Sequence, residues 1–141
     1  IINQAFKFHS QGNISEASKY YQQIINQGCE DYRCFSNYGV ILKNIGKLKE
    51  AELSTRKAIE INPDFAEAHY NLGNILKDLK NLDNAMSSYN RAGELGMDYN
   101  KCQVGIGNIL LEKGNHAEGI IKIKEGEGVI QFNLKNGLSF N

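Results

Sequence analysis

Three asparagines, Asn3, Asn37 and Asn71, are evenly spaced along the chain, and this regular spacing is the first feature that indicates binding chemistry. A side-chain amide carries two N–H donors and one carbonyl acceptor, so it can bind a peptide backbone running in either direction. Gly105 takes the fourth place in the series. Because one side chain per repeat forms a row along a stacked structure, we predict that these three residues make an asparagine ladder that binds a peptide.

Further polar residues keep the same spacing and would widen this stripe. Asn74 and Asn108 lie about one helical turn beyond the ladder positions, and Lys43 and Lys77 recur with the interval of the asparagines. We include all four as candidate groove residues, with the lysines placed to contact an acidic ligand. The alternative is a solvated helix face, because the chain contains 17 Asn and 13 Lys that composition alone would scatter over the surface.

No comparable pattern points to catalysis or to metal binding. The three histidines fall at unrelated repeat positions, and the sequence lacks a phosphate-binding Gly-rich loop, His-Glu-x-x-His and Cys-x-x-Cys. Cys29 and Cys34 are separated by four residues without a second pair, which is a poor zinc pattern. We therefore expect a non-enzymatic chain with no cofactor and no metal, whose cysteines are packing residues.

Charge and composition narrow the classes of partner. The 141 residues include 16 Lys+Arg and 16 Asp+Glu, and a net charge of zero gives no electrostatic reason to bind nucleic acid or an anionic membrane. No apolar run approaches the roughly 18 residues of a membrane-spanning helix, and no secretory signal is evident. We expect a cytoplasmic protein that binds another protein or a peptide.

A 34-residue period organises the whole chain and includes the asparagines above. Glycines recur in one register, with Lys80 in the missing step, and small and large apolar residues form two further columns. Several independent columns in step over four units indicate a repeat architecture. The columns are Gly12, Gly46, Lys80, Gly114; Ala17, Ala51, Ala85, Gly119; and Phe8, Leu42, Leu76, Leu110.

The unit of residues 66–99 reads as helix, short turn, helix. Apolar residues follow helical spacing on both sides of a polar break at Lys80-Asn81. Turn glycines permit the left-handed conformation that ends a helix, and Pro63 is expected to stop the second helix of the preceding unit. Small residues should let the paired helices approach closely, with Gly39, Gly73 and Gly107 facing Ala51, Ala85 and Gly119.

The segments Ala68–Ala92 and Asn37–Asp64 closely resemble the tetratricopeptide repeat (TPR) consensus. The resemblance implies an all-α fold, a right-handed α-solenoid of stacked helix-turn-helix units, in which the first helix of each pair lines a concave groove. The ladder is similar to that of the repeat region of O-linked N-acetylglucosamine transferases, carried over to Asn3, Asn37 and Asn71 only. The dicarboxylate clamp of chaperone-binding arrays is not expected, because the matching places hold Ile2, Phe6, Glu67 and Asn71 rather than Lys and Arg.

The register predicts four units, the first beginning inside a repeat, as a fragment of a longer array would. They span residues 1–31, 32–65, 66–99 and a degenerate 100–128, followed by a non-helical tail, 129–141. Partial alternation over Val129–Leu134 and an Asn136-Gly137 turn signal predict a short β-hairpin there, or an extended tail packed on the last helix.

Three hypotheses of function follow from these features. The preferred one is a non-catalytic scaffold that binds a peptide segment in its concave groove. The second is the substrate-recruiting repeat segment of a larger glycosyl- or sulfotransferase. The third is self-association through apolar array ends.

Overall fold

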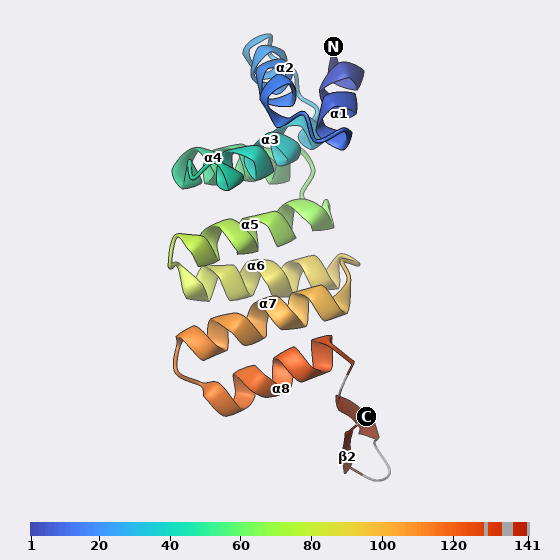
Figure 1. The fold of residues 1–141 in the computed structure, drawn as a ribbon, viewed down its shortest axis with the longest axis vertical. Coiled ribbons are helices and arrows are strands. Elements are labelled where there is room, and N and C mark those ends of the chain that lie inside the picture. Colours follow the sequence, from blue (N-terminus) through green and yellow to red (C-terminus); the bar gives the residue numbers. More distant parts are fainter. Residues whose placement is uncertain (129, 134–136, 141) are drawn as a thin grey trace.

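Eight helices follow one another as four consecutive pairs in this computed structural model, which describes residues 1–128, 130–133 and 137–140. Figure 1 shows α3 to α8 as stacked layers, with the α1–α2 pair turned relative to them. The helices are α1 Ile2–Ser10, α2 Ile14–Asn26, α3 Tyr32–Asn44, α4 Leu48–Ile61, α5 Ala66–Asp78, α6 Leu82–Glu94, α7 Tyr99–Glu112 and α8 His116–Gly126.

The turn inside each pair is made by a single residue in the left-handed conformation. Gly12, Gly46 and Gly114 have φ of +74°, +84° and +86°, as predicted from their shared column. Lys80, which replaces glycine in the third unit, has the same conformation with φ of +63°. The repeated turn therefore imposes its geometry even on a side chain that the left-handed region penalises by roughly 1–2 kcal/mol.

Other helix ends follow from local sequence. Asp31 and Asp98 cap α3 and α7, because their carboxylates accept backbone N–H groups of the first turn. Helix α4 ends at Ile61, two residues before Pro63, as predicted.

Small residues allow the two helices of a pair to lie close together. Ala17, Ala51 and Ala85 are fully buried. Cβ atoms added to Gly39 and Gly107 would meet the carbonyl oxygens of Ala51 and Gly119, as the spacing predicted. Their nearest atoms, however, belong to Thr55 and Ile123, and at Gly73 the three nearest atoms all belong to the ring of Tyr89 and none to Ala85.

The stack curves because its two sides are packed differently. The first helices of successive pairs contact one another directly, α3 with α5 and α5 with α7. Within the described residues, no comparable packing joins the second helices to one another; α2, α4 and α6 each pack instead on the first helix of the next pair. The shorter, inner side is therefore the side of the first helices, and the predicted all-α repeat solenoid is confirmed.

The C-terminal tail forms a two-stranded antiparallel hairpin, β1 Ile130–Asn133 and β2 Gly137–Phe140. Of the two forms predicted for the tail, this is the first. Gly137 pairs with Asn133, so it belongs to a strand and not, as predicted, to the turn. Val129, Leu134 and Asn136, which the prediction also used, lie outside the described residues.

Candidate functional site

The predicted groove residues all lie on first helices, α1, α3, α5 and α7, and their asparagines are held by different partners. Asn37 lies on α3, half-buried, and its amide Nδ2 donates to the hydroxyl of Tyr21 on α2 at 3.2 Å. The same hydroxyl lies 3.1 Å from Nδ1 of His9 on α1. Because the Tyr21 oxygen accepts from Asn37, its own proton is available to His9.

Burial sets the protonation of this network. It lowers the pKa of His9, an effect that the nearby carboxylate of Glu67 opposes, and so favours the neutral imidazole that can accept a proton. Burial also raises the pKa of Tyr21 to about 12, which keeps its phenol protonated. The chain of hydrogen bonds from Asn37 to Tyr21 to His9 is therefore complete at neutral pH, and no hydrogen bond among the described residues uses the amide oxygen of Asn37.

Asn71 has the same repeat position on α5 but a different partner. Thr55 stands one repeat after Tyr21, and its buried hydroxyl oxygen has no hydrogen-bond partner in the described structure. The amide Nδ2 of Asn71 donates instead to the hydroxyl of Ser36 on the neighbouring first helix α3, at 3.3 Å. Asn71 thus links two helices of the concave face and, like Asn37, keeps its amide oxygen free.

Tyr89 stands two repeats after Tyr21 and serves a third asparagine. Its hydroxyl donates to the Oδ1 of Asn74 on α5 at 2.6 Å. The fully buried ring passes between Gly73 and Gly105, where added Cβ atoms would come within 2.9 and 2.8 Å of its carbons. Gly105 replaces the ladder asparagine of the fourth unit because the ring fills that space.

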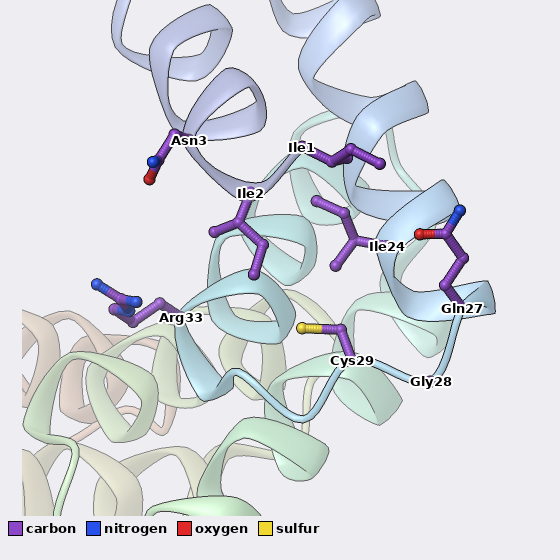
Figure 2. Close-up of a pocket in the computed structure, with 8 residues that line it drawn as sticks. All are labelled: Ile1, Ile2, Asn3, Ile24, Gln27, Gly28, Cys29 and Arg33. Carbon is purple, nitrogen blue, oxygen red and sulfur yellow. The ribbon is translucent and has the colours of Figure 1, made fainter.

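Asn3 differs from the other ladder residues in its exposure and in having no hydrogen-bond partner among the described residues. It is exposed and lies at the edge of a cavity of about 630 Å³ formed by α1, the end of α2 and the start of α3. Figure 2 shows Ile2, Ile24 and Cys29 around this terminal cavity, with Asn3 and Arg33 to one side. No hydrogen bond within the described residues fixes the Asn3 side chain.

Three predicted residues come together in one place. Asn74, Lys77 and Asn108 line a cavity of about 270 Å³ between α5 and α7, the α5–α7 pocket. Its wall also includes Lys101, which the sequence analysis missed although it lies on the same face of a first helix. Lys43, the repeat equivalent of Lys77, lies outside this pocket and pairs with Asp78 at 3.7 Å.

The two tyrosines were also missed as groove components. The signal available in the sequence was their shared repeat position, since Tyr21 and Tyr89 lie two repeats apart. Read only as apolar residues of the second helices, they did not suggest that their hydroxyls reach the asparagines of the first helices.

Within the two strands and residues 1–128, no group of three or more His, Cys, Asp or Glu could hold a metal ion. Burial raises the pKa of Cys34 to about 12 and also raises that of Cys102, so neither supplies a thiolate nucleophile. Across the same residues, every helix is too short or too polar to span a bilayer.

Comparison with known proteins agrees with this architecture. The family model "TPR repeat" matches residues 39–80, and "Tetratricopeptide repeat" matches residues 66–95. No curated protein sequence matches the chain significantly.

Many solved structures share the fold at low sequence identity. MamA is 18% identical with a TM-score of 0.79, over 88% of this chain and 72% of its own. YrrB, a TPR protein with an unusual peptide-binding site, is 20% identical with a TM-score of 0.78, over 88% of this chain and 66% of its own. The first TPR of Spaghetti (RPAP3), bound to the HSP90 peptide SRMEEVD, is 20% identical with a TM-score of 0.73, over 79% of this chain and 89% of its own.

Proposed function

We propose that this chain, whose residues 39–95 carry tetratricopeptide repeats, is a non-catalytic interaction module that binds an extended peptide in its concave groove. The peptide backbone would be bound by the asparagine ladder, Asn3, Asn37 and Asn71, as in the repeat region of O-linked N-acetylglucosamine transferases that the ladder resembles. The peptide-binding site of YrrB and the peptide complex of Spaghetti described above support this class of function for the fold.

One observation carries the proposal. Asn37 and Asn71 each use an amide nitrogen to bind a neighbouring helix, at 3.2 and 3.3 Å. In the described residues, no hydrogen bond uses their amide oxygens. Each side chain is therefore held in place while its amide oxygen, an acceptor that can bind a backbone N–H, stays free of protein partners in the described structure.

To test the proposal, peptides that bind the whole chain are selected from a displayed library of random sequences. The Kd of each selected peptide is then measured. The variant Asn37→Ala with Asn71→Ala removes two acceptors, each worth about 0.5–1.5 kcal/mol, and should weaken binding about tenfold. The matched control, Asn84→Ala with Asn90→Ala, changes two exposed asparagines of α6 and should leave Kd unchanged.

Helicity and melting temperature are followed in parallel, because Asn37 and Asn71 also link helices. If the selected peptides bind the ladder variant as tightly as the wild type, the asparagine ladder is not part of the peptide-binding groove. A library that yields no binder would contradict the function itself.

Self-association is a second candidate, favoured by the exposed side chains of Ile120 and Ile121 on α8, which are 51% and 39% accessible. Light scattering over a concentration series tests it, and a constant monomer mass would exclude it. Substrate recruitment for a larger transferase is the same peptide-binding chemistry placed beside a catalytic domain, which the full reading frame would reveal.

A further inference from the structure

We propose that the α5–α7 pocket is a subsite for an acidic side chain, Asp or Glu, of the bound peptide. This inference rests on the proposed function and goes beyond it, because the ladder binds backbone and does not choose a sequence. The pocket would give the groove its selectivity at one position.

The lining of the pocket is rich in donors and free of carboxylates. Lys77 on α5 and the exposed Lys101 on α7 line the same cavity of about 270 Å³ as three asparagines, Asn74, Asn100 and Asn108. No Asp or Glu of the described residues lines it. A single carboxylate fits such a volume and is an acceptor at both oxygens, so it matches a wall of donors in shape and charge.

The two lysines are available to a ligand. Neither Lys77 nor Lys101 takes part in an ion pair among the described residues, whereas Lys43, at the repeat position of Lys77, is neutralised by Asp78 at 3.7 Å. Lys77 is half-buried, where the attraction of a carboxylate is screened less than at a fully exposed lysine. Of these two equivalent lysines, the one without an ion-pair partner in the described structure is the one that lines the pocket.

The orientation of Asn74 also favours an anion. Its Oδ1 is occupied by the Tyr89 hydroxyl at 2.6 Å, and burial raises the pKa of Tyr89, so this hydroxyl remains a donor. The groups of Asn74 left over are its two N–H donors. Asn37 and Asn71 are held the other way round, by their nitrogens. The amide oxygens are therefore free at Asn37 on α3 and Asn71 on α5, and the N–H donors are free at Asn74, beside the α5–α7 pocket.

The experiment compares selection of displayed random peptides on the wild-type chain and on Lys77→Gln with Lys101→Gln. We expect wild-type binders to share one Asp or Glu at a constant place. The double variant should bind them about tenfold or more weakly, since hydrogen bonds to a charged group are the stronger ones. The matched control, Lys19→Gln with Lys49→Gln, removes the same charge from exposed positions on α2 and α4 and should retain the affinity.

Two further measurements separate a subsite from general charge attraction. Replacing the shared acidic residue of the peptide by its amide should weaken binding to the wild type about tenfold and to the lysine variant far less, as a double-mutant cycle requires. Tyr89→Phe frees the Asn74 amide to turn, so it should weaken the acidic peptide about threefold and leave the amide peptide unchanged.

The outcomes are distinct. Binders without a shared acidic residue, or an acidic peptide weakened equally by the Lys19 and Lys49 control, would overturn the subsite while leaving peptide binding intact. Absence of any binder would overturn both proposals.

Discussion

Two tyrosines at the same repeat position, Tyr21 and Tyr89, hold the groove in opposite ways. Tyr21 reaches forward to the asparagine of the next unit, accepting from Asn37 at 3.2 Å. Tyr89 stays with its own unit and donates to Asn74 at 2.6 Å. Both rings are fully buried, so the difference does not arise from exposure. It arises from the residues that each ring meets on the first helices.

Those residues differ at two repeat positions. Around Tyr21 they are Phe6, whose ring packs against it at 6.1 Å between centroids, and Asn37. Around Tyr89 they are Asn74 and Gly105. Each hydroxyl binds an amide on the first helix that offers one, and the Tyr21 hydroxyl also lies 3.1 Å from Nδ1 of His9 on the first helix of its own unit. In an array of near-identical units, the polarity that the groove shows to a ligand is therefore set by combinations of residues from different units.

The largest effect should come from Tyr89→Ala. Removing a fully buried aromatic side chain from the middle of the stack should lower the free energy of unfolding by about 3–5 kcal/mol. Urea unfolding followed by helical circular dichroism measures it. Tyr21→Ala should instead detach mainly the α1–α2 pair, because each unit of an array leans only on its neighbours. Equal, fully cooperative losses for both variants would contradict this distinction.

Gly105→Ala should be the next most harmful change. The new methyl group would lie 2.8 Å from the Tyr89 ring, which Gly73 confines on its other side, and overpacking of this kind costs about 1–3 kcal/mol. With about 1 kcal/mol of helix propensity regained, we expect a smaller net loss in urea unfolding than Tyr89→Ala causes. Gly93→Ala is the control, since its methyl group meets only Cys102 Sγ, at 4.0 Å; it should not destabilise the chain.

Removing one hydroxyl should have a smaller effect. Tyr89→Phe loses a single hydrogen bond and should cost about 1 kcal/mol, whereas Tyr21→Phe leaves both His9 and Asn37 without a partner and should cost about 1–2 kcal/mol. Chemical unfolding of the two variants side by side provides the comparison. A larger loss for Tyr89→Phe would reverse the order expected from the hydrogen bonds.

Acidification should have the smallest effect on the free energy of unfolding. It should act only at the Tyr21 network, which contains His9. The pKa of His9 is lowered by burial, so as pH falls below about 6.5 the unfolded chain binds a proton that the folded chain does not. Stability should therefore decline as the pH falls from neutral through this value. His9→Gln, which keeps an acceptor for Tyr21, should show a shallower decline in urea midpoint. If the urea midpoints of the wild type and His9→Gln fall equally with pH, His9 is not the cause of the decline.

Much of the fold follows from spacing alone. A column of glycines with one gap placed Lys80 at a left-handed turn position, and its φ of +63° agrees. The end of α4 before Pro63 was predicted as well. These features are local, because a turn or a helix stop depends on a few consecutive residues. Gly137 was assigned wrongly to a turn, since strand register depends on pairing with Asn133 and not on the local signal.

Less of the candidate site could be predicted from the spacing of residues in the sequence. The positions of Asn37, Asn71 and Asn74 on first helices came from the period, but which end of each amide is engaged did not. That Lys43 would pair with Asp78 was equally invisible. The orientation of each amide and the Lys43–Asp78 ion pair both depend on the identity and size of a side chain from another helix.

The order of the residues by itself determined that helices would pair and stack with a constant period, because repeated turn and packing residues act locally and act the same way each time. Only the folded stack decided where donors and acceptors point along the groove. The hydroxyl of Tyr21 reaches two first helices, at His9 and Asn37, whereas that of Tyr89 bonds Asn74 on one. The residues beside each ring, phenylalanine in one case and glycine in the other, come from other helices and set this difference.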